Sequence, residues 1–146
     1  MDYEISILEK LIEIDTNAIT KENYFECALL IKEMLEELNL EVKFFDPKFD
    51  DGIKRPSVMG YLDASSNYTI GLFAHYDIVP AGTGWTKPPF KLTIENDKIF
   101  GRGAADDKGA IAAILGALRI VKNNSRFNVM AVFSPEEEVG GELGLG

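Results

Sequence analysis

Leu72-Phe73-Ala74-His75-Tyr76-Asp77 is the stretch on which the predicted fold depends. Residues 68–75 are apolar almost throughout, which predicts a central β-strand that is covered on both faces and buries side chains such as Ile70. The strand ends at His75, the only histidine of the sequence. Open α/β sheets place functional sites at the carboxyl ends of their strands. Side chains two residues apart on an extended backbone point the same way, so we expect His75 and Asp77 to lie together.

Two later stretches carry chemistry that matches this one. Gly101 to Gly109 contains Asp106-Asp107 and leads into a helix that we predict over residues 108–122. This helix is apolar nearly all round, so we expect it to be buried against a sheet. Ser134 to Gly141 contains Glu136-Glu137-Glu138 and follows a second apolar strand, which we predict over residues 128–133. Each acidic cluster therefore stands at the end of a predicted element, in a loop where a site can be assembled.

The rest of the chain supplies further elements of an α/β fold. Apolar periodicity predicts helices over residues 3–14 and 22–38, and the second would turn Phe25, Leu29, Met34, Leu35 and Leu38 inward. Strands are predicted over residues 41–45 and 57–62, and a hairpin around Asn96-Asp97. Two helices, then strands, then a strand–helix–strand crossover indicate a mixed β-sheet covered by helices.

Composition limits the classes of partner. The 146 residues can form one domain with a real core. A net charge of −9 argues against nucleic acid and against anionic membrane surfaces as partners, and no apolar run is long enough to span a membrane. The single cysteine, Cys27, excludes an internal disulfide and fits a reducing cytoplasm, with burial in a helix as its expected role.

His75, Asp106 and Glu138 are the residue types that bind zinc. Hydrolysis of an amide at neutral pH needs a strong nucleophile and a group that polarises the carbonyl, and bound zinc supplies both. Asp77 is placed to accept the other ring proton of His75 and so fix its tautomer. Glu137 could take the proton from the attacking water. Together the three stretches predict a metal hydrolase site.

Each motif also has a purely structural interpretation when it is taken alone. His75 could be a packed or surface histidine, Asp106-Asp107 could cap the following helix, and Glu136-Glu137-Glu138 could be a solvated charge run. Gly101-Arg102-Gly103 could suggest a phosphate loop, but Asp106 stands where the third glycine would be and would repel a pyrophosphate. No single structural reading explains all the motifs jointly.

Jointly the motifs resemble the M20 metallopeptidase family. The motifs are His75 to Gly82, Gly84 to Phe90, Gly101 to Gly109 and Pro135 to Gly141, and they match in order and spacing over nearly the whole chain. This family includes acetylornithine deacetylases, succinyl-diaminopimelate desuccinylases, aminoacylases and glutamate carboxypeptidases. The resemblance implies a zinc-exopeptidase-like catalytic domain.

The resemblance also implies a role for each site residue. His75 matches a ligand of one metal, and Asp77 matches the acid that orients it. Asp106 matches the carboxylate that bridges two metals, and the peptide bond after it is often cis in the family. Glu137 matches the general base and Glu138 a ligand of the other metal. Two zinc ions are expected in the complete protein, with cobalt or manganese as alternatives.

The sequence departs from the family in two site-adjacent residues and in its length. Asp107 stands where relatives often have methionine or an amide, and Glu136 where they often have aspartate. Family members are longer, with another acidic ligand beyond Gly141, a histidine ligand near the C-terminus and an inserted lid domain that pairs two subunits. We therefore expect residues 1–146 to be the N-terminal part of a catalytic domain. The isolated chain should hold metals poorly and be inactive, and the complete protein should be a homodimer.

The expected reaction is cleavage of an N-acyl amino acid, of the deacetylase or desuccinylase type, by a metal-activated water. A short peptide is the other substrate class, which corresponds to a dipeptidase or carboxypeptidase of the same family. A third hypothesis is a non-catalytic binding module that retains the fold.

Overall fold

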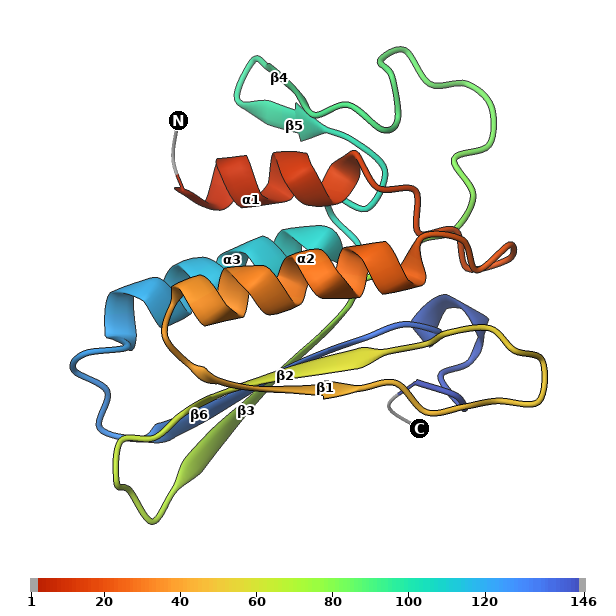
Figure 1. Ribbon diagram of the computed structural model, residues 1–146. Coiled ribbons are helices and arrows are strands. Elements are labelled where there is room, and N and C mark those ends of the chain that lie inside the picture. Colours follow the sequence, from red (N-terminus) through yellow and green to blue (C-terminus); the bar gives the residue numbers. More distant parts are fainter. Residues whose placement is uncertain (1–2, 145–146) are drawn as a thin grey trace.

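The computed structural model, which describes residues 3–144, has a mixed four-stranded sheet with helices packed on it (Figure 1). The strands are β1 (Glu41–Phe45), β2 (Ser57–Leu62), β3 (Thr69–His75) and β6 (Asn128–Ser134), in the order β1-β2-β6-β3. β2 is antiparallel to both β1 and β6, whereas β3 and β6 are parallel. This confirms the predicted α/β class with a mixed sheet.

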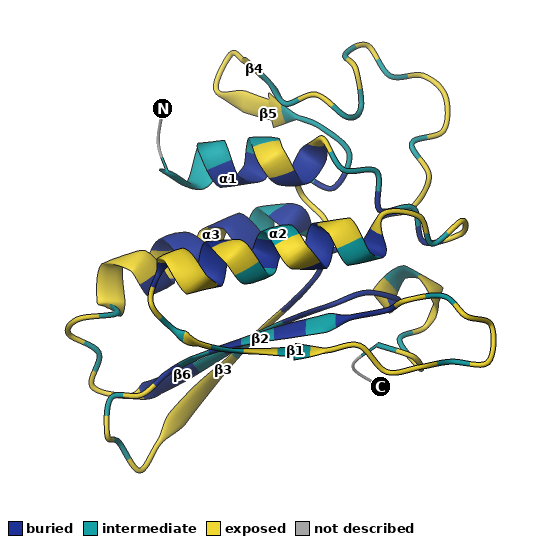
Figure 2. Cartoon of the chain, in the orientation of Figure 1, coloured by how far each residue is buried: buried dark blue, intermediate teal, exposed yellow. Residues whose placement is uncertain are grey.

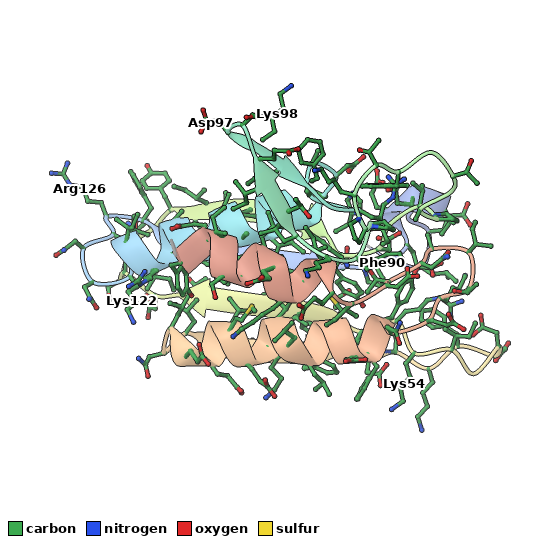
Figure 3. All side chains as sticks on the ribbon, turned by 90° about the horizontal axis from the view of Figure 1, so that it is seen from above. Lys54, Phe90, Asp97, Lys98, Lys122 and Arg126 are labelled. Carbon is green, nitrogen blue, oxygen red and sulfur yellow. The ribbon has the colours of Figure 1, made fainter. Side chains whose placement is uncertain are left out.

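The helices are α1 (Tyr3–Ile12), α2 (Tyr24–Glu37) and α3 (Lys108–Val121). α3 lies in the crossover from β3 to β6, as expected for a parallel pair, and a single 3₁₀ turn, η1 (Glu137–Val139), follows β6. The hairpin of β4 (Thr93–Glu95) and β5 (Lys98–Phe100) extends from the body, with Asp97 and Lys98 at its tip (Figure 3). None of the helices within residues 3–144 has the length and apolarity needed to cross a bilayer.

All three helices lie on the same side of the sheet (Figure 1). α2 packs on β1 and β2, α3 packs on β3, and α1 packs on α3. Figure 2 shows the buried residues gathered where these layers meet. α2 approaches β2 closely because Gly60 has no side chain, since a Cβ there would lie 2.6 Å from Leu35 Cδ2. Cys27 of α2 is buried in the core, as predicted.

The opposite face of the sheet is less protected. Burial alternates along β2 and β6, so Val58 and Phe133 are fully buried while their neighbours Met59 and Val132 are half-exposed. Because successive side chains of a strand point to opposite faces, the half-exposed residues share the face away from the helices. Among residues 3–144 no helix covers that face.

Three expectations about burial were wrong. β3 is an edge strand of the described sheet rather than a central one, and Ile70 on it is 46% exposed. Leu29 of α2 is exposed, and Ile120 shows that α3 is buried along one face only. An apolar sequence shows that a side chain could be buried, but it does not show which neighbour would cover it.

Candidate metal centre

Three predicted metal ligands meet at the carboxyl ends of β3 and β6. The parallel register pairs His75 with Ser134, so the two strands end side by side. His75 closes β3, Asp106 lies just before α3, and Glu138 lies in η1 just after β6. One potential ligand atom from each of these three side chains lies within 4.8 Å of the others. The structure thus brings together the residues that the sequence singled out.

His75 is nearly buried and makes contacts through both ring nitrogens. Its Nδ1 lies 3.0 Å from the Asp77 carbonyl oxygen and 3.3 Å from Asp77 Oδ1. Its Nε2 lies 3.0 Å from Asp106 Oδ1 and 3.7 Å from Glu137 Oε2. Burial lowers the pKa of His75, but its hydrogen bonds to Asp77 and Asp106 outweigh burial and raise the pKa to about 9. Nε2 is the ring atom turned toward the cluster of acids.

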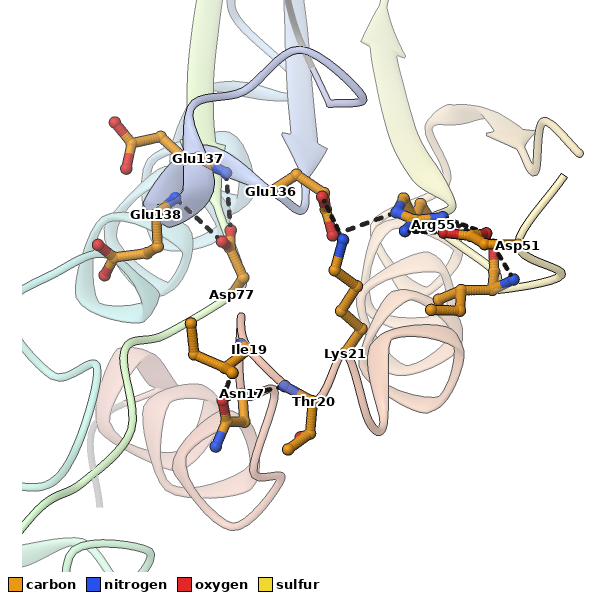
Figure 4. Close-up of polar contacts among 11 residues, drawn as sticks. Asn17, Ile19, Thr20, Lys21, Asp51, Arg55, Asp77, Glu136, Glu137 and Glu138 are labelled. Carbon is orange, nitrogen blue, oxygen red and sulfur yellow. Dashed lines mark hydrogen bonds and ion pairs between the residues drawn. The ribbon is translucent and has the colours of Figure 1, made fainter. Parts of the chain in front are cut away.

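Asp77 also holds the turn that follows β6. Its fully buried carboxylate accepts hydrogen bonds from the backbone N–H of Glu137, at 3.3 Å, and of Glu138, at 3.1 Å (Figure 4). The sequence predicted the contact of Asp77 with His75 but not this second one. These partners are 60 and 61 residues apart, so no local pattern could have indicated the contact.

The Asp106–Asp107 segment is fixed by contacts on both sides. Its peptide bond is cis, as the resemblance implied. Asp107 occupies the N-cap position of α3 but makes no capping hydrogen bond; its Oδ2 instead accepts one from the backbone N–H of His75, at 3.3 Å. Burial raises the pKa of Asp107. The interpretation of Asp107 as a helix cap is therefore wrong, and this residue ties the loop to the end of β3.

Lys108, which the sequence analysis missed, joins the Asp106–Asp107 segment to the end of α1. It is fully buried, and its Nζ donates to the carbonyl oxygens of Leu11, at 2.8 Å, and Ile14, at 2.6 Å, at the end of α1. These bonds add a side-chain donor to carbonyls at the end of α1, where few helical N–H donors remain; the Leu11 carbonyl also accepts from the Ile14 N–H. A lysine opening an otherwise apolar helix was the signal available in the sequence. Gly101 lies against Ile12 at the end of α1. The absence of a side chain permits this contact, because a Cβ at Gly101 would lie 2.6 Å from Ile12 Cδ1.

A cavity of about 180 Å³ opens beside the predicted ligands. His75, Asp107 and Glu137 contribute to its polar side, and Phe73 and Pro135 to its apolar side. Glu137 is the most accessible of the three glutamates after β6, with 64% of its side chain exposed. A small molecule in this cavity would contact both the apolar wall and the Glu137 carboxylate.

The donor set of the cluster fits a divalent metal ion. Five carboxylates surround one imidazole: Asp77, Asp106, Asp107, Glu137 and Glu138. Burial and the neighbouring Asp106 raise the pKa of Glu138, which is the expected effect of crowded negative charge. A cation would offset this repulsion, and imidazole with carboxylate is a ligand combination that zinc, cobalt and manganese accept.

Comparison with known proteins finds similar sequences and a similar solved structure. Residues 71–146 match the model of peptidase family M20/M25/M40. A cysteinylglycine-S-conjugate dipeptidase of Corynebacterium striatum is 38% identical over 130 residues, covering 83% of this chain and 27% of the relative. A succinyl-diaminopimelate desuccinylase of Acidiphilium cryptum is 43% identical over 68 residues, covering 47% of this chain and 18% of the relative.

Among solved structures, an M20 family metallo-carboxypeptidase from Sulfolobus solfataricus superposes with a TM-score of 0.84 and 34% identity. The match covers 97% of this chain and 32% of that one. The chain thus has the fold of part of an M20 catalytic domain. It spans less than a third of the length of each of these three proteins.

Proposed function

We propose that this chain, which belongs to peptidase family M20/M25/M40, supplies the first metal ligands and the general base of an amide hydrolase. The observation that carries the proposal is the convergence of His75, Asp106 and Glu138, whose ligand atoms lie within 4.8 Å of one another. Glu137 lies beside them, with Oε2 3.7 Å from His75 Nε2. Metal ligands next to an accessible carboxylate are what metal-assisted hydrolysis requires.

His75, Asp106 and Glu138 would hold the metal in the complete protein. Zinc is the proposed metal, and cobalt or manganese fit the same donors. When bound, the metal would supply Lewis acidity and lower the pKa of water. Asp77 keeps Nε2 of His75 directed at the cluster by engaging Nδ1.

Glu137 would move the proton of the reaction. Its carboxylate lines the cavity and is 64% exposed, so a water beside the substrate carbonyl can reach it. As general base Glu137 accepts a proton from the attacking water, and as general acid it returns that proton to the leaving nitrogen. The products are a carboxylate and an amine.

The proposed substrate is an N-acyl amino acid or a short peptide. A dipeptide is the first candidate, because a dipeptidase relative matches 83% of this chain, whereas desuccinylase relatives match 47% and 71% of it. Deacylation of an N-acetyl or N-succinyl amino acid is the second candidate. Catalysis is proposed for the complete protein, which we expect to be a cytoplasmic homodimer.

Zinc binding tests the ligand assignment directly. Native mass spectrometry of the chain in excess zinc should show a bound ion that His75→Ala removes and Glu137→Gln retains. Glu36→Gln, on the exposed surface of α2, is the matched control and should bind zinc as the native chain does. Equal zinc loading of the native and His75→Ala chains would contradict the assignment.

Turnover tests the base. In the complete protein, Glu137→Gln should lower kcat on a dipeptide or an N-acyl amino acid by about 10²–10⁴-fold, the usual contribution of a positioned general base. Unchanged turnover would exclude Glu137 as the base. Zinc binding without hydrolysis of either substrate class would favour the non-catalytic module.

A further inference from the structure

Glu136 forms a buried ionic cluster with Lys21 and Arg55, next to the turn that carries Glu137 and Glu138. Glu136 points away from the metal ligands, and its side chain is 4% exposed. Its Oε2 lies 3.0 Å from Lys21 Nζ, and its Oε1 lies 3.2 Å from Nε of Arg55, an ion pair without hydrogen-bond geometry. Figure 4 shows Glu136 on the side of Lys21 and Arg55, and its two neighbours on the other side. The interpretation of residues 136–138 as a solvated charge run is therefore wrong for Glu136.

The backbone at Glu136 explains why consecutive glutamates point in different directions. Glu136 has φ 73° and ψ 9°, a left-handed conformation that residues with a Cβ rarely adopt. The N–H groups of Glu137 and Glu138 then meet the carboxylate of Asp77. The turn is thus held on one side by Asp77 and on the other by the partners of Glu136.

Arg55 is itself fixed in place. Its guanidinium is 1% exposed and donates to both carboxylate oxygens of Asp51, from Nη1 at 2.9 Å and from Nη2 at 2.5 Å. The next residue, Pro56, accepts a hydrogen bond of 2.6 Å from the hydroxyl of Tyr76, which stands between His75 and Asp77. The segment that carries Arg55 is therefore joined to the end of β3.

Lys21 reaches the cluster from a second connected segment. The backbone N–H of Ile78 donates to the Thr16 carbonyl, and that of Ala18 donates to the Ile78 carbonyl. These bonds dock the loop between α1 and α2 on the residues that follow Asp77. Both cations facing Glu136 thus stand on segments that contact the end of β3.

We infer that Arg55 and Glu136, with Lys21, are positioning residues for Glu137 and Glu138; the roles of those two glutamates rest on the proposed function. A buried carboxylate is strongly disfavoured without its cations, so Glu136 keeps its inward position only while Arg55 and Lys21 face it. Loss of that anchor leaves the left-handed turn held only by Asp77 and by its own backbone hydrogen bonds, such as that from Gly141 N–H to the Glu136 carbonyl. Glu137 and Glu138 then lose their fixed position relative to His75 and Asp106.

Amide hydrogen exchange of the chain, followed by NMR, tests this inference without any metal. In Glu136→Gln the backbone amides of Glu137 and Glu138 should exchange at least about ten-fold faster than in the native chain, because their turn opens locally. Amides of Ala131 and Leu115, in β6 and α3, should keep their native rates. Glu36→Gln, which removes an exposed ion pair on α2, should change neither set.

Unchanged exchange at Glu137 and Glu138 would overturn the inference. A uniform acceleration that includes Ala131 and Leu115 would also overturn it, since the cluster would then stabilise only the fold. If Glu136→Gln does not fold, Lys21→Met decides, because Lys21 is the most exposed member of the cluster, at 23%. It should accelerate the two amides about three-fold or more and leave Ala131 unchanged; no acceleration would overturn the inference.

A zinc titration adds a readout for the site itself. Glu136→Gln should weaken zinc binding about ten-fold while the chain stays folded, and Arg55→Lys should weaken it less because a cation remains opposite Glu136. Native zinc affinity in folded Glu136→Gln would overturn the inference. A native chain that binds no zinc would instead contradict the proposed function, and hydrogen exchange would still decide the positioning role.

Discussion

The two faces of the four-stranded sheet carry similar apolar residues but differ in how far those residues are buried. On the helix-covered face, Phe133 and Val58 have no exposed surface. On the other face, Val132 and Met59 are half-exposed and Phe73 is 55% exposed. The residues of the covered face and those of the open face are both apolar, and they alternate along the strands. The difference teaches that burial here is decided by the helices packed on one side, not by the hydrophobicity of the strands.

The largest difference between the two faces should be in the free energy of unfolding, when neighbouring side chains of β6 are truncated. Phe133→Ala should lower the free energy of unfolding by about 3–5 kcal/mol, because it leaves a cavity beneath the helices. Val132→Ala, one residue earlier on the open face, should lower it by about 1 kcal/mol or less. Urea denaturation of both variants measures the difference. Equal losses would mean that the two faces contribute alike to stability.

The rate of cysteine labelling should show the next largest difference between the two faces. Cys27 is fully buried on the inner face of α2, and burial raises its pKa to about 11, so little reactive thiolate forms at pH 8. A disulfide reagent should label native Cys27 at least about a hundred-fold more slowly than the unfolded chain, since labelling requires opening of the core. Phe73→Cys in a Cys27→Ala background is the open-face control and should react rapidly. Fast labelling of native Cys27 would show that the helical layer opens readily.

The smallest difference between the two faces should be in the rate of methionine oxidation. Met34 is 4% exposed within α2, whereas Met59 and Met130 lie half-exposed on the open face. Dilute peroxide should therefore oxidise Met59 and Met130 several-fold faster than Met34. Peptide mass spectrometry after a short exposure gives the three rates. Similar rates would indicate that the open face is protected in solution.

The meeting of His75, Asp106 and Glu138 could be predicted because each residue ends or begins a strongly apolar element. The carboxyl ends of parallel strands meet at one edge, so topology alone brings such residues together. The Glu136 cluster could not be predicted, because Lys21 is 115 residues from Glu136 and nothing in either local pattern indicates the contact. The edge position of β3 was missed because an apolar run carries no information about which strands pair.

The edge position of β3 in the described sheet has a consequence for handling this chain by itself in solution. At the other edge, β1 carries the exposed charges Glu41 and Lys43, which discourage pairing with another chain. Thr69 to Phe73 of β3 carries no charge, and Ile70 and Phe73 are exposed along it. An uncharged apolar edge is a template on which strands of another molecule can align. Aggregation of concentrated samples of residues 1–146 is therefore expected to begin at β3, and Ile70→Lys would be the natural substitution to improve solubility.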